Sequence, residues 1–324
     1  MARVVKVLSI DGGGVRGIVP AMLAAELEQR TGRHVADLFD LLAGTSTGGV
    51  LALALARPGQ GGRAESAAEL IRLGRHQGRR TLSCPLLQGL YPAAARDGRG
   101  DAARAAELFL ADRFGSTRLG EAVTDVLVTA YDVDRRRPFL FSSKDARSRP
   151  GSDFRMRDVA RAATATRGHV APVRVRAGER AAWLRLADGA VFANDPAAWA
   201  LDEATRAHPG EQGGVLLVSL GTGRRREPMP GVPGGRAALE PRRLLPYGGR
   251  GELRFYRLQT GLEHGDEAMD DPRPEHVHEL ALRAETTIDE HDEVLDRICA
   301  ELLAGAVPAA AGPVLGVATS SGSP

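Results

Sequence analysis

Cysteine and lysine are scarce in this chain of 324 residues. The two cysteines, Cys84 and Cys299, lie far apart and in neither metal-ligand nor redox spacing, so we expect free thiols and no disulfide framework. Lysine occurs only at positions 6 and 144, and arginine supplies the rest of the positive charge. Because the formal net charge is only +2, no nucleic acid polymer is expected as a partner.

Long apolar runs are also absent. No run reaches the ~18 residues of a membrane-spanning helix, and no signal peptide is visible. We therefore expect a soluble, cytoplasmic protein without a transmembrane segment, which meets lipid as a peripheral protein at the membrane interface. No cluster of His, Cys and Asp has metal-ligand spacing, so neither a metal nor another cofactor is expected. The sequence indicates no oligomeric state.

The stretch Gly44-Thr45-Ser46-Thr47-Gly48 separates two apolar segments. Residues 38–43 are typical of a short buried strand, and residues 49–56, apolar on all sides and followed by Pro58-Gly59, are typical of a buried helix. A serine on the sharp turn between such elements has its hydroxyl exposed, while flanking glycines avoid collisions. This pattern predicts a nucleophile elbow with Ser46 as the nucleophile, although a glycine-rich turn with an incidental serine has the same letters.

A second glycine-rich turn follows the β-branched run at residues 4–10. It reads Asp11-Gly12-Gly13-Gly14-Val15-Arg16-Gly17 and precedes a helix expected at 20–30. Converging backbone N–H groups at a helix N-terminus suit an anion. The turn also fits the dinucleotide fingerprint, but the next strand does not end in the acidic residue which that reading needs. We therefore favour an oxyanion hole for Ser46 over a nucleotide site.

The remaining pattern alternates strands with helices, which predicts a mostly parallel central sheet flanked by helices in a three-layer α/β sandwich. Length alone allows one large domain or two ordinary ones. The expected further strands are 126–133, 138–142, 183–187 and 214–220. The expected further helices are 64–80, 101–113, 156–166, 196–207, 251–262 and 285–304. Segments 81–100 and 224–250 are expected to be loops, the first a surface loop or lid, and the Ala/Gly/Pro/Ser-rich segment 305–324 a disordered tail.

A serine nucleophile needs a base. None of the eight histidines closes an apolar strand as a triad would require, although His169 lies in a plausible loop before Ala171-Pro172. Asp188 instead follows the strand 183–187 directly and precedes Gly189, so its carboxylate is expected at the same sheet edge as Ser46. The alternative is that Asp188-Gly189 is a simple turn.

Taken together, the three motifs resemble those of the patatin-like phospholipase family. They are Asp11 to Gly17, Gly44 to Gly48, and Asp188-Gly189-Ala190. Similarity continues through residues 190–197, 219–223, 255–259 and 269–271, the last two resembling bacterial members. Segment 163–169, with Arg167-Gly168-His169, departs from the family pattern and puts substrate preference in question.

The resemblance implies one acyl hydrolase domain over residues 1–304, with a patatin-like or lysophospholipase-like fold, a Ser-Asp dyad and no metal. It implies hydrolysis of fatty acyl esters of phospholipids or lysophospholipids. The alternatives are a non-lipid esterase or acyl transferase on the same dyad, a nucleotide-binding regulator, and a cyclic-nucleotide-activated phospholipase effector of antiphage defence. The residues assigned by the resemblance are catalytic Ser46 and Asp188; oxyanion-hole Gly12, Gly13, Gly14, Val15, Arg16 and Gly17; elbow Gly44, Thr45, Thr47 and Gly48; and acid-motif Gly189 and Ala190.

Overall fold

A computed structural model describes most of the chain. The described residues are 3–76, 79–91, 99–165, 171–178, 181–208, 213–225, 251–263, 266 and 268–304. Two segments discussed above lie outside the described residues. They are the expected disordered tail, 305–324, and residues 167–169, where the sequence departs from the family pattern.

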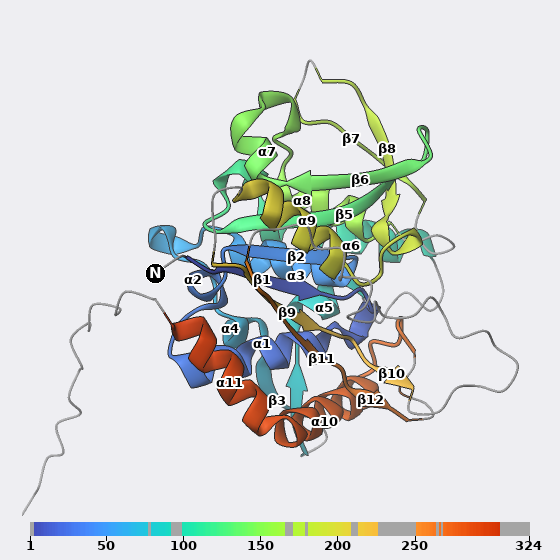
Figure 1. Cartoon of the computed structure of the whole chain (residues 1–324). Helices are drawn as coiled ribbons and strands as arrows, with labels where there is room; N and C mark the ends of the chain where they lie inside the picture. Colours follow the sequence, from blue (N-terminus) through green and yellow to red (C-terminus); the bar gives the residue numbers. More distant parts are fainter. Residues whose placement is uncertain are drawn as a thin grey trace, which may run out of the picture.

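The centre of the molecule is a sheet whose main strands run parallel (Figure 1). In spatial order these strands are β11 (Leu253–Leu258), β9 (Val215–Leu220), β1 (Val5–Ile10), β2 (Leu41–Thr45) and β5 (Asp125–Asp132). Their residues are mostly apolar and buried in β1, β2 and β9, as expected for strands covered on both faces. The carboxyl ends of parallel strands meet at one edge of the sheet, which we call the carboxyl edge.

Strand β5 is longer than β2 and has two partners end to end along one side. Its first part pairs with β2, with Thr129 opposite Thr45, and its last part pairs with antiparallel β8 (Leu184–Asp188), with Ala130 opposite Asp188. The ends of β2 and β8 therefore meet head to head, one residue apart along β5. On its other side β5 pairs with β6 (Arg137–Ser142), and β8 pairs with the short edge strand β7 (Val173–Val175).

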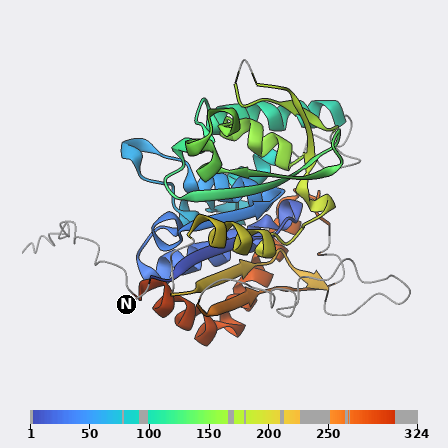
Figure 2. The ribbon, with the colours of Figure 1, turned by 45° about the horizontal axis from the view of Figure 1, so that its top comes forward.

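Helices cover both faces of the sheet (Figure 2). One face packs on α9 (Ala197–Ala207) through a cluster that includes Val5, Leu41 and Leu217. The other face and the helices behind it form the larger core. These helices are α1 (Ile18–Thr31), α3 (Thr47–Ala56), α5 (Pro85–Leu90), α6 (Arg99–Phe114), α8 (Met156–Ala163), α10 (Pro274–Glu290) and α11 (Asp292–Leu303). The expected three-layer α/β architecture is confirmed.

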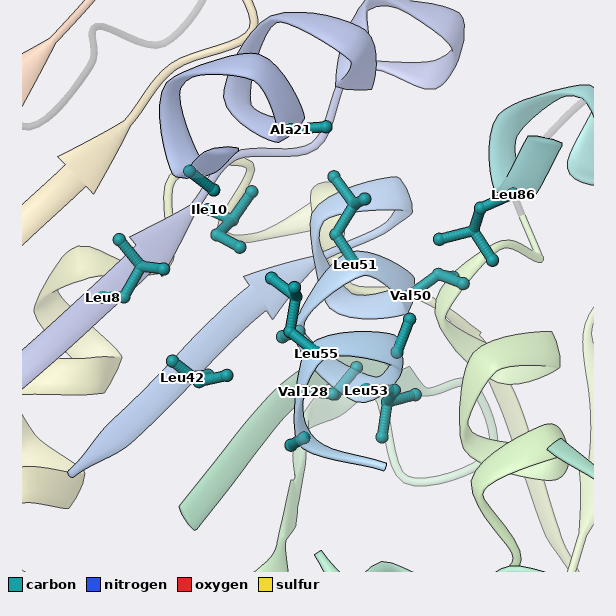
Figure 3. Close-up of a cluster of buried hydrophobic side chains, with 14 of the residues drawn as sticks. Leu8, Ile10, Ala21, Leu42, Val50, Leu51, Leu53, Leu55, Leu86 and Val128 are labelled. Atoms are coloured by element: carbon teal, nitrogen blue, oxygen red, sulfur yellow. The ribbon is translucent and has the colours of Figure 1, made fainter. Parts of the chain in front are cut away.

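Helix α3 lies at the centre of the larger core, and this explains why its sequence is apolar all round. Figure 3 shows Leu51 and Leu55 of α3 gathered with Leu8 and Leu42 of the neighbouring strands. Every residue of α3 is buried. A helix enclosed on all sides cannot move without disturbing the whole core, so its N-terminal residue is held in a fixed place.

Several sequence-based assignments are wrong. The helix expected at 285–304 is two helices, since α10 begins at Pro274 and ends at Glu290, before α11. Instead of a helix over 64–80, the single turn α4 (Ala67–Leu70) is followed by an antiparallel hairpin of β3 (Arg72–His76) and β4 (Arg79–Ser83), and Gly74 and Gly78 are poor helix residues. The expected loop 81–100 contains the end of β4, helix α5 with Pro85 in its first turn, and the start of α6. The expected helix 251–262 is strand β11 followed by β12 (Gly261–Leu262), because pairing with β9 favours the extended chain.

Smaller elements complete the fold. Residues Arg224–Arg225, expected in a loop, form β10 paired with β12, and residues 226–250 of that loop lie outside the described part. The short helices α2 (Val35–Leu38) and α7 (Ser143–Ser148) connect larger elements. Among the described residues, no helix is long and apolar enough to span a bilayer.

Candidate active site

Ser46 stands between β2 and α3 in a backbone conformation that serine rarely adopts, with φ 54° and ψ −127°. Such a conformation costs about 1–3 kcal/mol and persists only where the surroundings enforce it. They do so here through close backbone approaches. A Cβ atom on Gly44 would lie 2.2 Å from the carbonyl oxygen of Gly48, and one on Gly48 would lie 2.3 Å from that of Ile10. Ser46 therefore stands on a sharp, strained turn between a buried strand and a buried helix.

The hydroxyl of Ser46 donates a hydrogen bond of 2.7 Å to Oδ2 of Asp188. The other carboxylate oxygen, Oδ1, accepts one of 2.8 Å from the amide of Ala190. Both side chains are buried, with 6% of Ser46 and 2% of Asp188 exposed. The bond follows from the head-to-head meeting of β2 and β8, since Ser46 and Asp188 stand at the two facing strand ends.

Three of the described histidines contact backbone carbonyls away from this site. The ring nitrogens of His34, His276 and His291 contact the backbone carbonyls of Ala64, Ala268 and Thr287. His169, the histidine best placed by sequence, lies outside the described residues.

The amide hydrogens of the glycine-rich loop can be accounted for one by one. The amide of Gly12 donates to the carbonyl of Asn194 (3.0 Å), that of Val15 to Met269 (2.8 Å), and that of Arg16 to Gly13 (3.2 Å). Within the described part of the chain, the amides of Gly13 and Gly14 make no hydrogen bond. Buried amides without a partner are rare, so these two are the candidates in the predicted loop to bind an anion.

The rest of the loop is fixed by segments far away in the sequence. The carbonyl of Gly12 accepts a hydrogen bond from the side-chain amide of Asn194 (3.1 Å) and another from the hydroxyl of Thr222 (2.8 Å). Gly14 has φ +62°, and a Cβ atom on it would lie 1.8 Å from the carbonyl oxygen of Met269. Gly17 is the N-cap residue of α1, and a Cβ atom there would lie 2.7 Å from a Thr47 methyl carbon.

A buried ion pair holds the start of the loop. Arg257 on β11 donates from one nitrogen to Oδ1 of Asp11 (2.8 Å) and from the other to Oδ2. It also donates to the hydroxyl of Ser219 (2.6 Å) and lies 3.6 Å from a carboxylate oxygen of Asp195. Burial raises the pKa of Asp11 to about 7, against the opposing effect of the guanidinium. Burial lowers the pKa of Arg257, but the hydrogen bonds and charge of Asp11 and the charge of Asp195 raise it by more. The net change is a raised pKa, so the guanidinium stays charged.

The other predicted site residues lie around this centre and have structural contacts. The Thr45 hydroxyl donates to the carbonyl of Ala193 (2.7 Å) and contacts the hydroxyl of Thr129 (2.7 Å). Thr47 and Tyr91 share a hydroxyl–hydroxyl bond of 2.8 Å. Gly189 passes so close to Thr129 that a Cβ atom would lie 2.2 Å from its hydroxyl oxygen. The structure thus gathers all three predicted motifs at one place.

Several contacting residues had no role assigned from the sequence, among them Tyr91, Asn194, Thr222, Arg257 and Met269. The last four lie in the segments that resembled the family without an assigned function, namely 190–197, 219–223, 255–259 and 269–271. That resemblance could have identified these four residues as candidates for the site. For Tyr91, in the expected loop 81–100, the sequence contained no such signal.

Comparison with known proteins agrees with this geometry. The model of the family "Patatin-like phospholipase" matches residues 8–201. Patatin-like protein 2 of Arabidopsis thaliana is 31% identical over 254 residues, covering 69% of this chain and 61% of that protein. Patatin-2-Kuras 1 of Solanum tuberosum is 29% identical, covering 70% and 64%, respectively. The chain therefore spans about three fifths of the length of these plant relatives, and the closer likeness to bacterial members stays a prediction.

Among solved structures, VipD from Legionella pneumophila is similar with a TM-score of 0.44 and 12% identity, covering 92% of this chain and 67% of VipD. A likeness that weak carries no argument about function. The family match extends over more than half of the chain and includes the loop, the elbow and the acid motif. This chain belongs to the patatin-like phospholipase family.

Proposed function

We propose that this protein is a lipid acyl hydrolase in which Ser46 is the nucleophile and Asp188 the base. The observation that carries the proposal is the buried 2.7 Å hydrogen bond from the Ser46 hydroxyl to Asp188, next to the glycine-rich loop, where a Cβ atom on Gly12 would lie 3.2 Å from Cβ of Ser46. The substrate class, fatty acyl esters of phospholipids or lysophospholipids, is proposed from membership of the family. We also propose that residues 1–304 act as one domain, since β11, α10 and α11 complete the sheet and core from the end of that range.

The first half of the reaction forms an acyl-enzyme. Oγ of Ser46 attacks the ester carbonyl carbon while its proton moves to Oδ2 of Asp188. The carbonyl oxygen becomes an oxyanion that accepts hydrogen bonds from the amides of Gly13 and Gly14, each worth about 3 kcal/mol in transition-state stabilisation. Collapse of the tetrahedral intermediate breaks the bond to the alcohol, which leaves with the proton held by Asp188.

The second half returns the enzyme to its starting state. A water molecule gives a proton to Asp188 and attacks the acyl carbon, and the same two amides hold the second oxyanion. When the intermediate collapses, Oγ of Ser46 leaves and regains the proton from Asp188, and the fatty acid is released. In this scheme the amide of Ala190 keeps the carboxylate facing Ser46 through Oδ1. The positive end of the α3 dipole also favours the oxyanions.

The test uses a fluorophosphonate probe and a soluble chromogenic ester. We expect covalent labelling at Ser46, and loss of both labelling and hydrolysis in Ser46→Ala. Asp188→Asn keeps the size but not the basicity, so it should lose kcat about as fully. The double variant should be hardly worse than either single one, because the two residues act as one unit.

Ser142→Ala is the matched control. Ser142 is also a buried serine that donates to a carboxylate, Oε1 of Glu203, at 2.6 Å. It lies away from the elbow at the end of β6, so its loss should leave labelling and hydrolysis unchanged. Labelling that persists in Ser46→Ala, or a mild effect of Asp188→Asn, would contradict the proposed dyad. Release of free fatty acid from phospholipid vesicles, absent with Ser46→Ala, then separates a lipid hydrolase from an esterase of water-soluble substrates.

A further inference from the structure

Two neighbouring hairpins extend beyond the carboxyl edge, past the level of Ser46. Strand β5 continues from Thr129, opposite the end of β2, to a turn that starts at Val133, about 13 Å further along the strand. The β7–β8 hairpin lies beside it, since the amide of Val133 donates to the carbonyl of Arg185 at 3.0 Å. In Figure 1 these hairpins lie at the far side of the molecule from α10 and α11.

Arginines are concentrated on the two hairpins. Arg135 and Arg136 lie in the β5–β6 turn and Arg137 begins β6, and all three are exposed. Arg174 on β7 is exposed, and Arg176, directly after β7, is half-buried. We call these five residues together with Trp183 the basic hairpin surface.

Trp183 directly precedes β8, with 49% of its surface exposed. The guanidinium carbons of Arg174 and Arg176 lie 5.1 Å and 4.7 Å from the centre of its ring. The indole therefore contacts two cations while about half of its surface faces solvent. The pairing fixes the ring at low entropy cost, and an exposed tryptophan among arginines is the arrangement that favours a membrane–water interface.

Nearby carboxylates neutralise the charge of this surface only in part. Asp132 pairs with Arg135, and Asp134 pairs with Arg185. Arg136, Arg137 and Arg174 form no ion pair with any carboxylate among the residues that the structure describes. The sequence of 171–187 contains four arginines and one glutamate, so the excess of positive charge is local, in a chain whose formal net charge is only +2.

We propose that the basic hairpin surface docks the protein on an anionic phospholipid bilayer. Trp183 would enter the headgroup region, and the arginines would contact lipid phosphates, each contributing about fivefold to the binding constant. A contribution of this surface to catalysis rests on the proposed function, in which the substrate is a lipid. The hairpins stand on the same edge as Ser46, so docking would turn the site toward the membrane. Val191 and Met269, which neighbour the acid motif and the oxyanion loop, are also exposed apolar side chains, at 45% and 51%.

The experiment measures binding in the Ser46→Ala background, so that hydrolysis cannot change the vesicles. Flotation is compared for vesicles of phosphatidylcholine alone and of phosphatidylcholine mixed with phosphatidylglycerol. We expect binding to the mixed vesicles, weakened at least tenfold by Arg136→Glu/Arg137→Glu and by Arg174→Glu/Arg176→Glu, and several-fold by Trp183→Ala. The matched control is Arg297→Glu/Leu303→Ala, which alters an exposed arginine and an exposed apolar residue on α11. It should bind as the parent does.

The same substitutions are then made with Ser46 intact. Hydrolysis of a soluble monomeric ester should stay within about twofold, while hydrolysis of anionic vesicles falls with binding. Equal binding to both kinds of vesicle, or parental binding by the hairpin variants, would overturn the docking proposal. Absence of any vesicle binding would also overturn it, and is the result expected if the surface binds an acidic protein instead. If binding behaves as expected but no ester is hydrolysed, the proposed function fails and the docking surface stands.

Discussion

Arg257→Met tests whether the buried ion pair controls the geometry of the oxyanion loop. The substitution keeps an unbranched side chain but removes both hydrogen bonds to Asp11, the bond to Ser219 and the charge beside Asp195. Only 17% of the Arg257 side chain and 6% of the Asp11 side chain are exposed. Removal of one partner, which leaves the other buried and unpaired, lowers the free energy of unfolding by about 3–5 kcal/mol. The melting temperature should fall by roughly 10 °C.

Activity should fall as well, even when it is expressed per folded molecule. Asp11 directly precedes Gly12, so we expect the position of its carboxylate to affect where the amides of Gly13 and Gly14 point. Displacement of oxyanion donors by as little as 1 Å lowers kcat by about 100-fold, while KM changes little. The assay is kcat on the soluble ester at a temperature where circular dichroism shows both proteins folded. Arg254→Met on the same strand is the control, because its partly exposed pair with Glu301 is worth about 1 kcal/mol or less.

The deficit in stability should depend on pH in a defined direction. Burial raises the pKa of Asp11 to about 7, above its value of about 4 in the unfolded chain. The stability linked to this proton is therefore complete below about pH 4 and is lost as pH rises through about 7. Without the guanidinium the pKa of Asp11 rises further, so the variant carries an unpaired buried charge mainly at high pH.

The difference in melting temperature between Arg257→Met and the parent should be largest near pH 8 and smallest near pH 5. A variant with parental kcat would refute the positioning role even if it were less stable. A stability deficit that is the same at both pH values would refute the assignment of Asp11 as the charge left behind.

Other expectations test the loop, the base and the absence of a metal. Gly14→Ala should lower kcat on the soluble ester by at least about 100-fold, because the new methyl group collides with the Met269 carbonyl oxygen; the control Gly32→Ala, at a similar φ of +67° with open space around it, should cost only stability. His169→Ala should keep the kcat of the parent, and a loss as large as that of Asp188→Asn would favour a Ser-His arrangement. Hydrolysis should be unchanged in EDTA, and a loss restored by calcium or zinc would contradict a metal-free mechanism.

Local sequence patterns predicted the parts of the site that are built from consecutive residues. The elbow needs a buried strand, a buried helix and small residues between them, and all of these are contained in residues 38–56. The loop after β1 and the acid after β8 are likewise short strand-end motifs, so their existence was predictable from composition and order. The same local reasoning failed at 64–80, 81–100 and 251–262, where pairing or packing with distant residues decides between helix, strand and loop.

The sequence by itself determined the chemical groups, the alternation of strands and helices, and the family. Only the tertiary structure decided how those groups meet. The register of β5 brings the ends of β2 and β8 together and so places the Ser46 hydroxyl 2.7 Å from Asp188. Distant carbonyls accept hydrogen bonds from the amides of Gly12 and Val15, whereas the amides of Gly13 and Gly14 have no backbone partner among the described residues. Arg257 fixes Asp11 across 246 residues of chain. These contacts depend on strand register and backbone packing between remote segments, for which a linear pattern contains no signal.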